Sequence, residues 1–174
     1  MLLAALLAAF LIDVDAGQIP STGPPPAAEL HSLRAKLIDR INKDRAQYNL
    51  PPLTADPIAQ RAAQYQAENM LATGNLEHTD SSGRAPMQRY NDMGGKADYY
   101  GENVGFRAPG VLDPVLLWNV LAKLEAEMMA EVPPNDGHRQ NILSSHYNAV
   151  GIGVAVGPRG VFMAEDFVGN TPKE

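Results

Sequence analysis

Apolar residues recur every three or four positions along two long stretches of the chain, with polar and charged residues between them. In residues 28–48 these positions are Leu30, Leu33, Leu37 and Ile41. After Asp113-Pro114 they are Leu117, Leu121, Leu124 and Met128. This spacing places the apolar side chains on one side of an α-helix. The sequence therefore predicts two amphipathic helices, each of which buries one face.

Local start signals predict three more helices. Asp56-Pro57 combines an N-cap residue with a proline at the first helical position, so a helix is expected from there to about residue 71. Shorter helices are expected over residues 85–92 and from Asp136 onward. Three of the five predicted helices thus lie in the first 100 residues.

Alternating apolar and small residues mark the C-terminal region. Residues 148–156 follow this pattern, and residues 160–168 come after a Gly-Pro-Arg-Gly turn, which predicts an antiparallel hairpin. Residues 100–107 supply a candidate third strand. Gly151 and Gly153 are expected to let a helix pack closely on this sheet. Helices followed by a small antiparallel sheet indicate a layered α+β fold.

The N-terminal segment differs from the rest of the chain in composition. Residues 1–12 form an apolar run that is too short to cross a bilayer, which takes about 20 residues, and Val14 and Ala16 fit a small-residue cleavage pattern. We therefore predict a signal peptide over residues 1–16. Because no Lys or Arg precedes the run, a retained anchor and a buried N-terminal helix are the alternatives. Residues 17–27 are uncharged and rich in proline, and we expect them to form an extended linker.

The net charge of the chain argues against two classes of binding partner. The 174-residue chain has 14 Lys plus Arg against 20 Asp plus Glu, a formal charge of −6. Nucleic acid and anionic membrane surfaces both require a basic face, so we expect neither as the main partner. The chain contains no cysteine, which excludes disulfides, a thiol nucleophile and thiolate-ligated metal sites.

Three polar segments stand at the boundaries of the predicted elements. They contain His78, Glu102 and His138, each among residues that favour turns. Two imidazoles with one or two carboxylates suit Zn²⁺ or a similar divalent ion, and the same groups can perform acid–base chemistry. Alternatively, they are capping and buried hydrogen-bonding residues. Their separations along the chain are too long for a local ligand motif, so spacing alone leaves both interpretations open. His31 and His146 are expected to be solvated.

Several short motifs occur in a characteristic order along the chain. They are the first helix with Ile41-Asn42 and Arg45, the Leu50-Pro-Pro-Leu53 turn, Leu76-Glu-His-Thr79, Gly101-Glu-Asn-Val-Gly105, Gly137-His-Arg-Gln-Asn-Ile-Leu143 and Val150-Gly-Ile-Gly-Val154. In this order they resemble the CAP superfamily, also called the SCP or PR-1-like domain, in its exported bacterial form. The resemblance runs from about residue 33 to residue 168 and implies a CAP domain over residues 28–170. It implies an α-β-α sandwich with a three- or four-stranded antiparallel sheet between helical layers.

The resemblance also implies a set of site residues. In the family, two His and two Glu converge in a central cleft that can hold a divalent metal, often zinc. Matching by motif assigns His78, Glu102 and His138 to three of these positions.

The fourth position depends on how the preceding helix is aligned. The family places this glutamate three residues after an aromatic residue. Glu131 occupies the position if Met128 replaces the aromatic residue. Alignment on Trp118 would place Leu121 there instead and leave a triad. We prefer Glu131, because it lies seven residues before His138 at the end of the predicted helix.

These observations lead to three functional hypotheses. The first is a secreted binding or interaction module, acting on an unidentified partner in the extracellular space or cell envelope. Its cleft would take zinc, another divalent metal or a small ligand, with no organic cofactor. The second is a metal-assisted hydrolase that uses the same cleft on peptides or cell-wall fragments. The third, lipid or sterol binding, rests on resemblance to eukaryotic relatives. No nucleophile is evident, so we expect binding rather than turnover, in a monomer without a stable membrane span.

Overall fold

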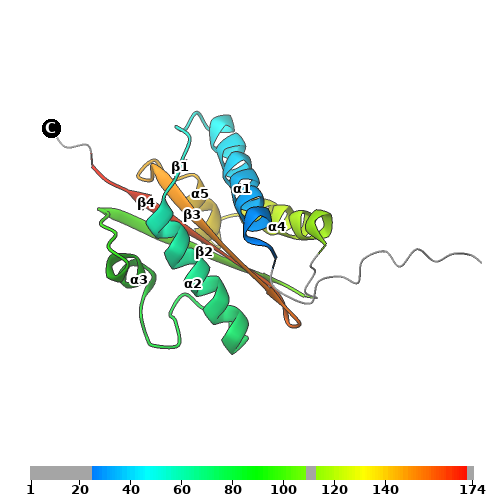
Figure 1. The fold of residues 1–174 in the computed structure, drawn as a ribbon. Helices are drawn as coiled ribbons and strands as arrows, with labels where there is room; N and C mark the ends of the chain where they lie inside the picture. The colour runs from blue at the N-terminus through cyan, green and yellow to red at the C-terminus, as the bar shows by residue number, and fades with distance from the viewer. Residues whose placement is uncertain (1–24, 109–112, 172–174) are drawn as a thin grey trace, which may run out of the picture.

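A four-stranded sheet lies between two layers of helices in the computed structural model, which describes residues 25–108 and 113–171 (Figure 1). The helices are α1 (Ala27–Gln47), α2 (Pro57–Thr73), α3 (Pro86–Asp92), α4 (Pro114–Met129) and α5 (Gly137–Ile142), and the strands are β1 (Thr54–Ala55), β2 (Tyr99–Arg107), β3 (Ala149–Gly157) and β4 (Gly160–Gly169). The predicted signal peptide and residues 17–24 of the predicted linker lie outside the described residues. Within residues 25–108 and 113–171, no helix has the length and apolar character needed to cross a bilayer.

The strands lie in the order β1-β3-β4-β2, which makes β2 an edge strand. The predicted hairpin of β3 and β4 is antiparallel, and β2 pairs antiparallel with β4. The sheet differs from the predicted antiparallel sheet at its other edge, where β1 pairs parallel with β3 through Thr54 and Ala149. This pairing arises because the chain passes β3 on its way from α1 to α2. The Asp56 N–H donates to the Val150 carbonyl at 3.0 Å just before α2 begins.

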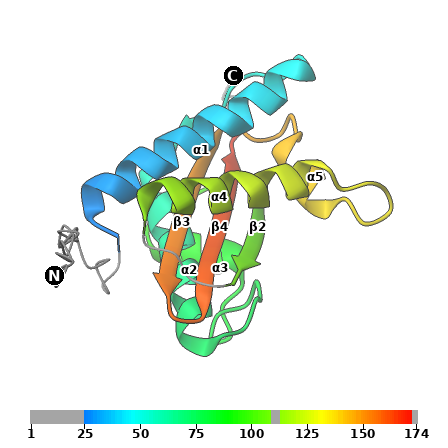
Figure 2. The same ribbon diagram turned by 90° about the vertical axis from the view of Figure 1, so that its right-hand side faces the viewer.

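Different helices cover the two faces of the sheet. Figure 2 shows α1 and α4 in front of the strands and α2 and α3 behind them. On the face of α1 and α4, the apolar stripes predicted from the sequence form the main core, in which Leu37, Ile41, Leu117 and Leu121 are fully buried against β3 and β4. The prediction of two amphipathic helices is confirmed.

Glycines allow α2 to lie directly on β3. A Cβ atom added at Gly151 would stand 2.0 Å from the backbone nitrogen of Gln60, and one at Gly153 would stand 2.1 Å from the carbonyl oxygen of Ala63. Real Cβ atoms do not approach other atoms so closely, so only glycine fits at these two positions. The predicted close packing of a helix on the strand glycines is therefore confirmed.

Candidate functional site

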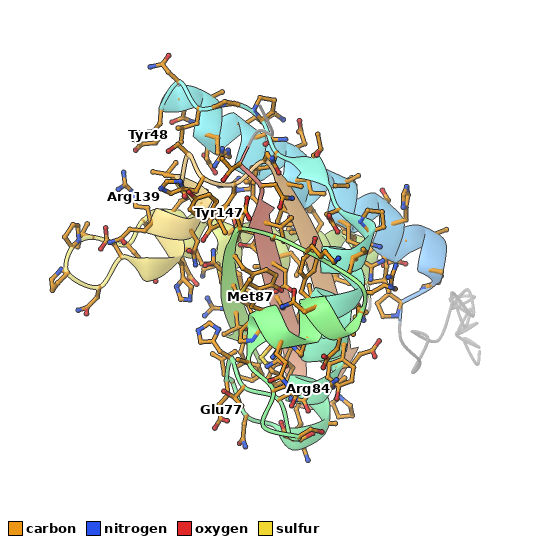
Figure 3. The ribbon with its side chains drawn as sticks, turned by 90° about the vertical axis from the view of Figure 1, so that its left-hand side faces the viewer. Tyr48, Glu77, Arg84, Met87, Arg139 and Tyr147 are labelled. Carbon is orange, nitrogen blue, oxygen red and sulfur yellow. The ribbon has the colours of Figure 1, made fainter. Side chains whose placement is uncertain are left out.

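A polar cleft of about 490 Å³ opens beside the edge strand β2. Its lining comes from the segment after α2, from β2, from the segment between α4 and α5, and from α5 itself. The lining residues are His78, Glu102, Glu131, Asn135, Gly137, His138, Gln140 and Asn141. All four residues proposed for the site from the sequence are among them. Figure 3 shows two residues adjacent in sequence to the cleft histidines: Arg139 of α5 lies near Tyr48 at the upper left, and Glu77 lies at the lower left.

His78 and Glu102 form the first pair of site residues. The Nδ1–H of His78 donates to Glu102 Oε1 at 2.9 Å. The Glu102 side chain is 1% exposed, whereas that of His78 is 54% exposed. The hydrogen bond to Glu102 raises the pKa of His78, because the carboxylate stabilises the imidazolium form. The pair thus presents an oriented imidazole to the cleft.

Arg89 of α3 contacts this pair on its buried side. Sequence reasoning did not identify this residue. Its guanidinium is fully buried and donates to Glu102 Oε2. It also donates to the carbonyl oxygens of His78, at 2.7 Å, and Arg84, at 3.1 Å. One side chain therefore fixes both the carboxylate and the loop that carries the imidazole. No local pattern distinguishes such an arginine from a solvated one, because its contacts with His78 and Glu102 lie more than ten residues away on either side.

His138 and Glu131 form the second pair. The Nδ1–H of His138 donates to Glu131 Oε1 at 2.5 Å, and its backbone N–H donates to Glu131 Oε2 at 3.0 Å. Glu131 lies two residues after the end of α4, and His138 lies in the first turn of α5. The alternative fourth residue, Leu121, is fully buried in the main core. The structure therefore places Glu131, and not Leu121, beside the second histidine.

The two pairs have the same internal arrangement. In each, a carboxylate accepts from Nδ1, so Nε2 is the remaining ring nitrogen. Carboxylate-held imidazoles of this kind are typical metal ligands. Within the described ranges, no group of three or more His, Cys, Asp or Glu is arranged to hold an ion. Both carboxylates are engaged at Nδ1, so the two Nε2 atoms are the groups left to meet a cation in the cleft.

Two asparagines connect the pairs across the edge of the sheet. Asn141 of α5 donates through Nδ2 to Asn103 Oδ1 at 2.9 Å and to the Glu102 carbonyl at 3.4 Å. Asn103 donates through Nδ2 to the His138 carbonyl at 3.3 Å. Both amides lie in motifs noted in the sequence, but only the fold shows that they meet.

Buried carboxyl groups lie behind the cleft in both layers. On the α2 side, Asp166 is fully buried, and burial together with the negative charge of Glu102 raises its pKa well above the ordinary value. On the α4 side, burial raises the pKa of both Glu125 and Glu165. A raised pKa favours the protonated form, so these groups limit the net negative charge beneath the cleft.

The comparison with protein families agrees with this fold. A family model described as the cysteine-rich secretory protein family, CAP, matches residues 38–169. The match covers most of the chain, and this protein therefore belongs to the CAP family. It does so without any cysteine of its own.

Individual relatives share the fold at low sequence identity. YkwD, an uncharacterized protein of Bacillus subtilis (strain 168), is 22% identical over 134 residues, which cover 77% of this chain and 46% of that protein. The chain thus spans about half the length of this curated relative. An extracellular SCP-domain protein of Bacillus anthracis str. Ames matches with a TM-score of 0.62 at 21% identity, over 80% of this chain and 41% of that chain. NaASP2, solved with Zn²⁺, matches with a TM-score of 0.60 at 12% identity, over 78% of each chain.

Proposed function

We propose that this protein is an exported CAP-domain binding module whose cleft takes a divalent cation or a small polar ligand. One observation carries the proposal: two imidazoles from opposite helical layers line a single polar cleft, and each is held at Nδ1 by a carboxylate. Preorganised imidazoles favour a ligand that engages their Nε2 atoms. A bound cation would supply Lewis-acid character, and His78 and His138 are the residues that would hold it.

Export is supported by the N-terminal sequence and by the relatives. Residues 1–16 have the composition of a signal peptide, and a structural neighbour is described as an extracellular protein. The partner is therefore expected in the extracellular space or the cell envelope.

A zinc titration by calorimetry on the full chain tests the cleft. The test variant combines His78→Ala with His138→Ala. The matched control combines His31→Ala with His146→Ala, which removes two exposed histidines away from the cleft. We expect micromolar or tighter binding by the wild type and by the control, and its loss in the test variant. Equal binding by all three proteins would contradict a cation site in the cleft.

An activity assay on the wild type and on His78→Ala distinguishes binding from catalysis. The wild type is incubated with peptides and cell-wall fragments, with and without a chelator. We expect no turnover. Turnover that the chelator and His78→Ala both abolish would contradict the binding-module proposal and favour a metal-assisted hydrolase.

A further inference from the structure

Two adjacent residues of β2, Glu102 and Asn103, form hydrogen bonds on opposite faces of the sheet. Neighbouring strand residues point to opposite faces of a sheet. Glu102 is paired in register with Asp166 and reaches His78 on the α2 side, whereas Asn103 is paired with Glu165 and reaches α5 on the other side. The two halves of the cleft are thus joined through one dipeptide.

Asn103 is fully buried, and both ends of its amide are used. Its Nδ2 donates to the His138 carbonyl at 3.3 Å and to Glu165 Oε2 at 3.1 Å, and its Oδ1 accepts from Asn141 at 2.9 Å. An amide nitrogen has two hydrogens, so these two acceptors use its full donor capacity.

The backbone of His138 is consequently held on both sides. Its N–H donates to Glu131, and its carbonyl oxygen accepts from Asn103. Glu131 belongs to the same layer and to the connection between α4 and α5. The contact with Asn103 relates His138 directly to the strand that carries Glu102, and through Glu102 to His78. Asn141 of the same helix adds a second link, through its hydrogen bonds to Asn103 and to the Glu102 carbonyl.

We infer that Asn103 is a positioning residue that sets where His138 stands relative to His78 across the cleft. The inference deepens the proposed function, because the spacing of the two imidazoles determines which ligand they can hold together. Asn103 acts through the His138 carbonyl and is not itself a cleft-lining residue.

Two variants separate this role from a purely structural one. Asn103→Asp keeps the size of the side chain but removes both donated hydrogen bonds. Adding Glu165→Gln to Asn103→Asp restores a hydrogen bond between positions 103 and 165 with reversed polarity, while the His138 carbonyl still lacks its donor. Asn119→Asp, at an exposed position of α4, controls for the added negative charge.

Three properties are measured on the full chain: the unfolding temperature, the ring resonances of His138 and His78 by NMR, and zinc affinity. For Asn103→Asp we expect a lower unfolding temperature, displaced His138 resonances and zinc affinity reduced roughly 10- to 100-fold. In the double variant we expect the unfolding temperature to recover, but not the His138 resonances or the zinc affinity. The control should match the wild type in all three.

The outcomes distinguish this inference from the proposed function. Recovery of both the unfolding temperature and the His138 resonances in the double variant would overturn the positioning role. The contact between positions 103 and 165 would then explain both effects of Asn103→Asp. Absence of zinc binding by the wild type would count against the proposed cation site alone. The NMR comparison would still decide whether Asn103 positions His138.

Discussion

Glu125 of α4 and Glu165 of β4 place two carboxyl groups in the protein interior. Both are fully buried, and they lie close enough to share a hydrogen bond when one carries a proton. Burial is the main cause of the raised pKa of each group, and the charge of Glu165 raises the pKa of Glu125 further. Folding at neutral pH therefore favours uptake of a proton by this pair.

This proton uptake predicts how stability depends on pH. A carboxyl with a raised folded-state pKa contributes stability that is fully present below its ordinary value of 4.5 and is lost as the pH rises through the folded-state pKa. Glu125→Gln supplies a permanent amide donor to Glu165. We expect it to raise the free energy of unfolding at pH 8 by about 1 kcal/mol and to flatten its decline between pH 4.5 and pH 8.

Urea unfolding at several pH values measures both effects. Glu127→Gln, on the same helix but half-exposed, is the control and should keep the wild-type pH dependence. A Glu125→Gln protein with an unchanged slope would show that the pair does not bind the extra proton.

The contact between α2 and β3 determines the separation of one helical layer from the sheet. Glycine in a strand normally costs stability, because the unfolded chain is more flexible there. At Gly151 and Gly153 this cost is offset by the close approach of the helix backbone. The position of α2 also determines where the segment carrying His78 leaves the helix.

Gly151→Ala should therefore destabilise the protein, although alanine favours a strand more than glycine does. The added methyl group would force α2 away from the sheet, and we expect a loss of about 1–3 kcal/mol in the free energy of unfolding. Gly137→Ala is the control, since nothing lies within 4 Å of a Cβ atom there. Equal stability of the two variants, by thermal unfolding, would contradict direct helix-on-strand packing.

Much of this arrangement could be predicted from the sequence, because its signals are local. The Asp56-Pro57 start and the apolar stripes each depend on neighbours within a few residues. The strand glycines indicate a close contact with a helix but not which helix makes it. The parallel pairing of β1 could not be predicted, since two residues carry no periodicity. Nor could the contact of Arg89 with Glu102, because charge and spacing do not indicate which buried partner a side chain meets.

Across the whole molecule, Arg45 connects parts that are distant in sequence. Its guanidinium, 1% exposed, donates to the carbonyl oxygens of Pro51 at 2.9 Å, Ile142 at 2.7 Å and Ser144 at 2.8 Å. Burial lowers its pKa. Helix α1 is thereby joined to the end of α5, the helix that begins at the cleft. The sequence placed Arg45 in a family motif but did not reveal this role.

Arg45→Met should leave the buried Ile142 carbonyl, and the partly buried carbonyls of Pro51 and Ser144, without this donor. Because an unsatisfied buried group costs about 1–3 kcal/mol, we expect a loss of about 3 kcal/mol in the free energy of unfolding. We also expect faster amide hydrogen exchange in α5. Arg61→Met, at an exposed arginine of α2, is the control and should change stability by less than about 0.5 kcal/mol. Unchanged exchange in α5 would show that Arg45 does not hold that helix.

The division of Glu102 and Asn103 between the two faces of β2 makes the cleft sensitive to strand register. A slip of β2 by one residue along β4 would turn the carboxylate toward α5 and the amide toward His78, exchanging their roles. Loops around the cleft can change length without this effect, because they do not alter the alternation of the strand. Inserted or deleted residues within β2 should therefore disturb both pairs at once, whereas a change of length between α4 and α5 would affect only the pair of Glu131 and His138. This difference is a practical guide for redesigning the domain.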